Sequence, residues 1–212
     1  MAERGAKGLA IFLGNVESPM NYWDNCYKFR QDSNFLYYWG IDEPLFAATL
    51  DLETGEECIY GNDVDIDDII WMGPQDSVAV KAASVGVSNS RPYAEFAKAI
   101  AAARAKGREI HFLPAARHYT QMTLASLLGL APEEVVTAGK KGCAKASDAL
   151  VRSVISMRLV KDALEIAEID KACDLGYEMH TVARQGVKVG TVEQEIVGKM
   201  EGATMCKGWG PS

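Results

Sequence analysis

Short apolar runs separated by turn-forming residues occupy the first part of the chain. Gly40 ends an aromatic-rich run, Pro44 precedes the next one, and Gly55 lies in a polar stretch between the last two. Short runs that are rich in aromatic and β-branched residues and are bounded by Gly or Pro are typical of strands. We therefore expect a β-meander in this region. Its strands are predicted at residues 9–13, 35–39, 45–50 and 58–60.

Helical and extended patterns alternate from residue 61 onward. Pro92 suits the first turn of a helix, whereas Gly107 and Gly129 suit helix ends. Strands followed by alternating helices and strands predict an α/β fold, with a mixed sheet covered by helices on both faces. The predicted segments are an acidic-capped segment at 65–71, helices at 76–84, 92–105 and 119–128, and a strand at 109–113.

The pattern changes again near residues 157–161, where we place a domain boundary. Beyond it no strand pattern occurs, and a segment of more than twenty residues that ends before Gly186 has the spacing of an amphipathic helix. Thr191 and Gln194 match a capping box that would open another helix. The apolar positions that define the long helix are Ile166, Ile169, Cys173 and Tyr177.

Charge limits the partners that the chain can have. Its 212 residues carry a formal net charge of −7, whereas phosphate binding requires clustered Lys and Arg. We therefore expect no nucleic-acid partner and interpret the small basic clusters at residues 104–108 and 140–141 as solvated.

Cysteine usage and the apolar runs indicate the compartment. The five cysteines lie far apart and form no C-x-x-C pair, unlike a disulfide framework or a zinc ribbon. The apolar run at residues 9–13 is not followed by a signal-peptide cleavage site, and no run approaches the ~18 apolar residues of a membrane span. We therefore expect a cytoplasmic protein with no membrane partner.

None of the catalytic, metal-binding or phosphate-binding motifs that we looked for is complete in this sequence. The acidic stretch at residues 62–68 begins like a calcium loop, but Asp68 and Pro74 stand where such a loop needs Gly and Glu. The three histidines are isolated, no H-E-x-x-H or G-x-S-x-G motif occurs, and residues 139–142 lack the spacing of a phosphate loop. Residue chemistry alone therefore predicts no catalytic constellation.

Three segments resemble signature sequences of one peptidase family. Residues 27–44 resemble the Y-x-F-R-Q signature of Xaa-Pro aminopeptidases, residues 69–73 resemble the family's I-W-x-G segment, and residues 157–166 resemble the junction that opens its catalytic domain. The chain is therefore similar to the N-terminal part of the creatinase, prolidase and aminopeptidase P family. It departs from the signatures at Trp39, where the family has Thr, and at Asp162, where it has Ser or Thr.

The resemblance implies a domain organisation. In this family an N-terminal α/β domain with an RNase H-like sheet precedes a "pita-bread" catalytic domain. We expect the first domain at residues 1–157 and the start of a truncated pita-bread domain at 158–212. The family binds two metals, usually manganese, through two Asp, one His and two Glu that lie beyond these helices. The chain alone is therefore expected to bind no metal and to be inactive.

The resemblance also implies a function for a longer parent enzyme. That enzyme would be a metal-dependent Xaa-Pro aminopeptidase acting on peptides with proline second, and this chain would be its oligomerisation and substrate-access half in a homodimer. Two alternatives stay open. One is a stand-alone, non-catalytic assembly or regulatory module of the same fold, and the other is the N-terminal half of a prolidase or creatinase.

Two residues carry a substrate role by resemblance. Asp24 matches an acidic residue that helps hold the amino-terminal end of the substrate, and Trp71 matches a tryptophan that reaches toward the neighbouring subunit's cleft. The alternative interpretations are a turn aspartate and a core tryptophan.

Overall fold

The computed structural model describes residue 1 and residues 5–136 and 145–208. The contacts divide the chain into two compact units, Met1–Met157 and Arg158–Ser212, and each is described here by itself. The sequence motif at residues 139–142 and the basic pair at 140–141 lie outside the described residues, as does Cys143.

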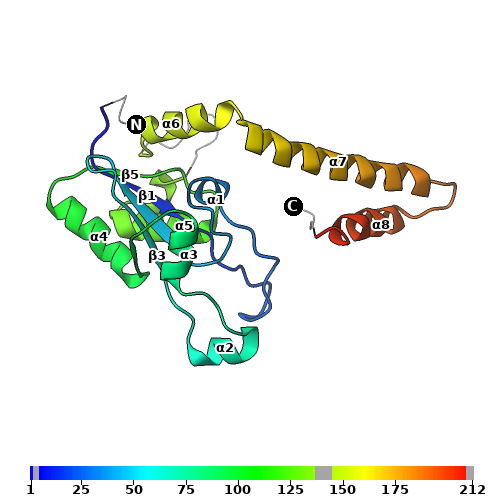
Figure 1. The fold of residues 1–212 in the computed structure, drawn as a ribbon, viewed down its shortest axis with the longest axis horizontal. Coiled ribbons are helices and arrows are strands. Elements are labelled where there is room, and N and C mark those ends of the chain that lie inside the picture. The colour runs from blue at the N-terminus through cyan, green and yellow to red at the C-terminus, as the bar shows by residue number, and fades with distance from the viewer. Residues whose placement is uncertain (2–4, 137–144, 209–212) are drawn as a thin grey trace. The chain divides into compact units, whose positions relative to one another are not determined.

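A five-stranded mixed sheet forms the centre of the first unit (Figure 1), in the order β4-β3-β2-β1-β5. β1 pairs antiparallel with β2 and β2 with β3, whereas β5 runs parallel to β1 and β4 runs parallel to β3. The strands are β1 (Leu9–Leu13), β2 (Ala47–Asp51), β3 (Glu57–Gly61), β4 (Ser90–Pro92) and β5 (Ile110–His111).

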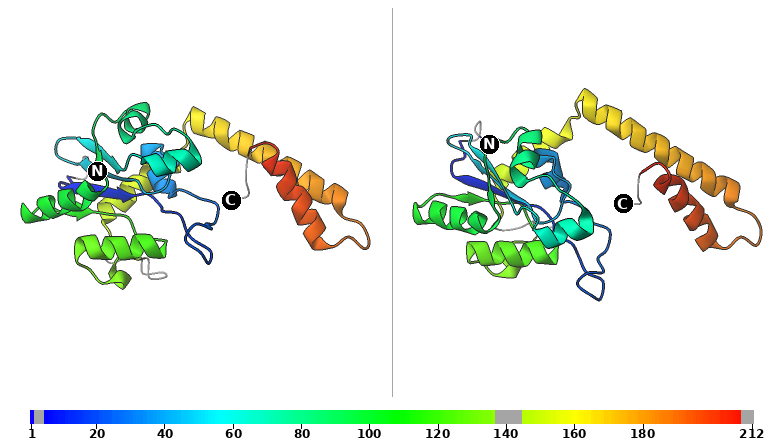
Figure 2. Two further views of the ribbon diagram at one scale, coloured as in Figure 1. Left: turned by 90° about the horizontal axis from the view of Figure 1, so that it is seen from below. Right: turned by 60° about the horizontal axis from the view of Figure 1, so that its bottom comes forward.

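Helices cover both faces of this sheet, as the edge-on view in Figure 2 shows, which confirms the predicted α/β class. The helices of this part of the chain are α1 (Ser33–Trp39), α2 (Ile66–Met72), α3 (Val78–Ser84), α4 (Ala94–Ala105), α5 (His118–Leu128), the 3-10 turn η2 (Pro132–Glu134) and α6 (Asp148–Leu159); α2 has no buried residue and does not cover the sheet. The sequence pattern did not indicate α6.

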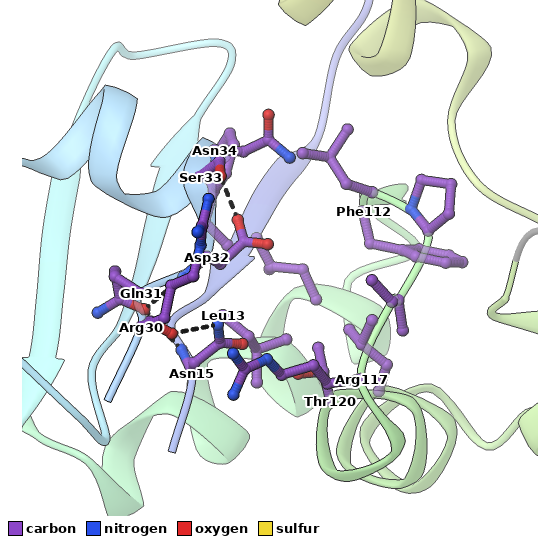
Figure 3. A pocket seen from close by; sticks show the side chains of 17 residues that line it. Leu13, Asn15, Arg30, Gln31, Asp32, Ser33, Asn34, Phe112, Arg117 and Thr120 are labelled. Atoms are coloured by element: carbon purple, nitrogen blue, oxygen red, sulfur yellow. Dashed lines mark hydrogen bonds between the residues drawn. The ribbon is translucent and has the colours of Figure 1, made fainter. Parts of the chain in front are cut away.

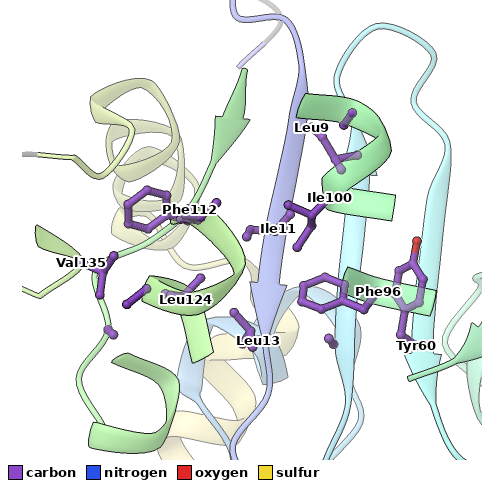
Figure 4. Packing of buried hydrophobic residues seen from close by; sticks show 14 of the residues in the cluster. Leu9, Ile11, Leu13, Tyr60, Phe96, Ile100, Phe112, Leu124 and Val135 are labelled. Atoms are coloured by element: carbon purple, nitrogen blue, oxygen red, sulfur yellow. The ribbon is translucent and has the colours of Figure 1, made fainter. Parts of the chain in front are cut away.

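The core has two parts because β1 is buried on both faces. All five residues of β1 are buried, and successive side chains of a strand point to opposite sides. Ile11 packs with Ile100 of α4 and Leu124 of α5 in one cluster (Figure 4). Phe12 packs with residues of α1, α3 and α6 in the other cluster. A strand that is apolar throughout is therefore what a central position in this sheet requires.

Residues 35–39, predicted to be a strand, form most of α1, so that prediction is wrong. The side chain of Asp32 accepts hydrogen bonds from the backbone N–H groups of Asn34 and Phe35, both at 2.9 Å. Gly40 ends the helix with φ 64°. Both ends are thus capped, and the i, i+4 spacing places Phe35 and Trp39 together on the buried face. Capping and helical spacing override the strand preference of aromatic residues.

The prediction that Pro92 opens a helix is also wrong. Pro92 is the last residue of β4, and α4 begins at Ala94. β4 is an edge strand, where a residue without an N–H group is tolerated. Of the remaining predicted elements, the strand at residues 9–13 has the predicted bounds and the others are present with at least one shifted end. For example, α3 begins after Ser77, whose hydroxyl accepts from Val80 N–H, and α5 ends at Gly129 with φ 63°.

The second unit consists of two helices, α7 (Ala163–Gly186) and α8 (Glu193–Met205). Asp162 and Glu165 form a capping box at the start of α7. The box predicted for α8 is absent, because that helix begins after Val192 without a side-chain cap and Thr191 donates its hydroxyl to the carbonyl of Gly186 instead.

No described helix combines the length and the apolar character needed to cross a membrane.

Candidate functional site

Gln31 of the Y-x-F-R-Q segment is a structural cross-link. Its side chain is 4% exposed. Oε1 accepts hydrogen bonds from the backbone N–H groups of Asn15 at 2.7 Å and Asp32 at 2.9 Å. Nε2 donates to the carbonyls of Ile41 at 3.1 Å and Glu43 at 2.7 Å. One buried amide therefore ties Asn15, two residues after β1, to both ends of the α1 segment, and every donor and acceptor in this set is satisfied.

A cavity of about 190 Å³ lies beside this cross-link (Figure 3). β1 and β5 are parallel, so their carboxyl ends meet at one edge of the sheet, and ligands of open α/β sheets commonly bind outside such ends. Asn15 and Arg30 line the cavity from the β1 side, whereas Phe112, Arg117 and Thr120 line it from the β5 and α5 side.

Asp24 lies at the turn of a small exposed hairpin that precedes the cross-link. Backbone hydrogen bonds close this hairpin, from Met20 N–H to Asn25 O at 2.9 Å and from Tyr27 N–H to Ser18 O at 2.9 Å. Asp24 is exposed and does not line the cavity. The structure thus places it in a turn on the surface.

The cysteines near this hairpin and in the sheet are not activated nucleophiles. Burial, followed by the negative charges of Glu17 and Asp24, raises the pKa of the Cys26 thiol. Burial also raises the pKa of Cys58. Because the thiolate is the reactive form, both groups stay protonated thiols at neutral pH.

Trp71 lies on α2 and is 88% exposed, so the core interpretation from the sequence is wrong for this residue. The side chain of Asp65 accepts from Asp68 N–H at 3.0 Å and caps the helix, and no residue of α2 is buried. Ile66 and Ile70 of the same helix are 75% and 72% exposed. Trp71 and Asp24 lie on separate segments, and neither lines the cavity.

The histidines are not part of a metal site among the described residues, and His111 has a structural role. His111 is 2% exposed; Nε2 lies 2.8 Å from the carbonyl of Lys7, and Nδ1 lies 2.7 Å from the hydroxyl of Ser147. Since the carbonyl can only accept, Nε2 donates to Lys7, and Ser147 is the partner of the other ring nitrogen. Among the described residues, no group of three or more His, Cys, Asp or Glu is placed to hold a metal ion.

A comparison with protein families decides the relationship. The family described as "Aminopeptidase P, N-terminal domain" matches residues 1–111. The chain belongs to this family. The match includes the Gln31 cross-link, the cavity residues from β1, and both Asp24 and Trp71.

Curated relatives of this aminopeptidase P N-terminal domain include fungal proteins. A probable Xaa-Pro aminopeptidase of Ajellomyces capsulatus is 27% identical over 198 residues, which cover 92% of this chain and 36% of the relative. One from Penicillium rubens is 35% identical over 69 residues, or 32% of this chain and 14% of the relative. The chain thus spans well under half of these proteins.

Solved structures show the same fold. The low-pH form of Escherichia coli aminopeptidase P matches 96% of this chain and 46% of its own chain, with a TM-score of 0.73 and 21% identity. A zinc-substituted form of the same E. coli enzyme in complex with product matches 94% of this chain, also with a TM-score of 0.73. The α/β sheet and its helices are therefore those of the N-terminal region of aminopeptidase P.

Apart from residues 30–34, which belong to the segment that resembles the family signature, the sequence pattern did not indicate the residues that line the cavity. Asn15 follows β1, whereas Arg117 and Thr120 lie at the start of α5, the helix that follows β5. Polar residues just after two apolar strands are a usable signal for a site at a sheet edge. That signal requires knowing that the two strands are adjacent and parallel, which the sequence pattern did not show.

Proposed function

We propose that this chain is the N-terminal, oligomerisation and substrate-access half of a metal-dependent Xaa-Pro aminopeptidase. Such an enzyme hydrolyses the bond between an N-terminal residue and a following proline. The observation that carries the proposal is the family match over residues 1–111, and the shared fold over 96% of the chain supports it.

Metal chemistry belongs to another part of the proposed enzyme. Two bound metal ions, manganese according to the family resemblance, would supply an activated water and stabilise the charge that develops on the peptide oxygen. The described residues offer no ligand set for such ions. In the proposal, this chain contributes shape, contacts and access, and we expect it to be inactive by itself.

The exposed aromatic residues support a substrate-access role. Trp71 is 88% exposed, so most of its apolar surface is in contact with water. Packing against another molecule would bury that surface, which is favourable. Trp71 would do so against a peptide in the cleft of a second subunit, where its ring suits the flat face of a proline. Asp24, on the exposed hairpin, would help to hold the positively charged amino terminus of the same peptide.

The second unit favours this proposal over a stand-alone module. Leu164 and Tyr177 of α7 are 80% and 72% exposed, and Thr204 is the buried residue among those described in α7 and α8. Helices of this kind derive most of their stability from packing an apolar face. A catalytic domain that continues the chain would cover these side chains.

The test is a peptidase assay on two proteins, the 212-residue chain and the product of its complete coding sequence. With added manganese, we expect the longer product to cleave X-Pro peptides and not X-Ala peptides, and the 212-residue chain to cleave neither. Past Ser212 the longer product should contain two Asp, then one His and two Glu. Turnover by the 212-residue chain, or equal cleavage of X-Ala peptides by the longer product, would refute the proposal.

A further inference from the structure

Among the described residues, two arginines at the rim of the cavity have no acidic partner. Arg30 approaches from the β1 side and Arg117 from the start of α5 (Figure 3). By contrast, Arg108 of the same unit forms ion pairs with Asp51 and Glu53. Within the described residues, neither rim guanidinium forms an ion pair. Each therefore keeps its planar set of donors free for a carboxylate or a phosphate.

Hydrogen bonds hold the backbone that carries Arg30 in place. Asn15 is 6% exposed, and its Nδ2 donates to the backbone carbonyl of Arg30 at 2.8 Å. The backbone N–H of Asn15 donates to Gln31, whose side chain is fully hydrogen-bonded. The backbone that carries Arg30 is thus held in place, so a ligand would pay little to order it.

One acidic residue also lines the cavity, and its charge is partly compensated. Asp32 faces the cavity, but its Oδ1 accepts hydrogen bonds from Asn34 N–H and Phe35 N–H. Hydrogen bonds from backbone N–H groups stabilise a carboxylate where it stands. Two arginines against one compensated aspartate leave a site that favours an anion.

The size and the apolar wall indicate what kind of anion fits. At a liquid volume of about 30 Å³ per water, a cavity of about 190 Å³ holds a ligand of roughly six or more non-hydrogen atoms. Leu13, Phe112, Pro114 and Leu124 line it beside the polar groups. Inorganic phosphate would leave this wall uncovered, whereas an organic acid would cover it.

We propose that this cavity is a binding site for a small organic carboxylate with an apolar body, held by Arg30 and Arg117. This site is separate from the peptidase chemistry of the proposed function and does not depend on it, because every residue involved lies between Ile11 and Leu124 of the first unit.

An NMR titration of the ¹⁵N-labelled 212-residue chain tests the proposal with isobutyrate, neutral isobutyramide and inorganic phosphate as probes. We expect isobutyrate to shift the amide signals of Asn15, Ser33 and Thr120 in a saturable way, isobutyramide to shift them weakly, and phosphate to bind more weakly than isobutyrate. Losing one charge-assisted hydrogen-bonding group typically weakens binding by about tenfold or more. Arg117→Gln and Arg30→Gln should each do so.

Arg91→Gln is the matched control, since Arg91 is an exposed arginine on β4 outside the cavity. It should leave isobutyrate binding unchanged. Because Arg30 and Arg117 are also exposed, the variants should keep the wild-type melting temperature, and if one variant fails to fold the other still decides the matter. Equal binding of isobutyramide, tighter binding of phosphate, or an equal loss in Arg91→Gln would overturn the proposal.

Discussion

Helices α1 and α2 have the same length and similar caps, but α1 packs into the core whereas α2 is exposed to solvent. Each has seven residues, an aspartate at its N-cap and a glycine at its C-cap. Each carries a tryptophan near its C-terminal end. Trp39 of α1 is 3% exposed, whereas Trp71 of α2 is 88% exposed. The same local design therefore produces a core element in one case and an uncovered surface element in the other.

The difference lies in what each helix packs against. Trp39 contacts Phe12 of the central strand β1, with ring centroids 5.7 Å apart in an edge-on arrangement, and Gln31 fixes the start of α1 to the end of that strand. α2 has no buried residue. Capping decides that a segment is helical, but its tertiary partners decide whether it serves the fold or is free to contact other molecules.

The largest effect should come from Trp39→Ala. Truncating a buried tryptophan costs about 3–5 kcal/mol, which is a large part of the roughly 5–15 kcal/mol that stabilises a domain. Denaturant unfolding of the 212-residue chain measures it. Trp39→Phe is the control; it keeps most of the packing and removes an indole N–H that is buried without a hydrogen-bond partner. If Trp39→Ala unfolds like the wild type, α1 is not part of the core.

The next effect concerns the cross-link that holds α1. Gln31→Ala should lower the free energy of unfolding by about 2–4 kcal/mol, because each buried group left without a partner costs about 1–3 kcal/mol. Gln75→Ala, in the segment after α2, is the matched control, since Gln75 makes an exposed 3.4 Å hydrogen bond to Met72 O and should change little. Equal effects of the two substitutions would show that Gln31 does not anchor the helix.

The next effect, on the free energy of unfolding, should distinguish the N-cap residues of α1 and α2. Losing an N-cap side chain costs about 0.5–2 kcal/mol. Asp32→Ala should fall at the upper end of that range, since Asp32 accepts two hydrogen bonds at a helix that is part of the core. Asp65→Ala should fall at the lower end or below it, because α2 can fray without exposing the core. Thermal melts of both variants suffice, and a larger loss for Asp65→Ala would reverse the comparison.

The same contrast explains how far the sequence alone could lead. Local hydrogen bonds and backbone angles mark the ends of α3, α5 and α7, so these helices could be predicted. Ser77 begins α3, Gly129 ends α5 and Asp162 begins α7. Residues 35–39 read as a strand because aromatic residues favour sheets, and only the caps at Asp32 and Gly40 indicated otherwise.

The sequence pattern did not predict which helices are buried or which strands are adjacent. Nothing in the spacing of α2 distinguishes an exposed Trp71 from a core tryptophan, because its neighbours are apolar in either case. The pairing of β1 with β5 joins residues about a hundred positions apart, and that pairing creates the cavity between Arg30 and Arg117. The family resemblance, carried by residues 27–44, 69–73 and 157–166, indicated the fold and a substrate role for Trp71, which the periodicity of the sequence did not.

The smallest effect on stability, and the most direct test of the proposed role, belongs to Trp71→Ala in the longer enzyme that we propose. An aromatic contact contributes about 0.5–1.5 kcal/mol beyond its area burial, so kcat/KM for X-Pro-Y peptides should fall roughly three- to tenfold. The fall should be smaller for X-Pro dipeptides. Because Trp71 is exposed, the melting temperature should stay at the wild-type value. Unchanged kinetics on both substrates, or a collapsed melting temperature, would contradict a substrate-access role for α2.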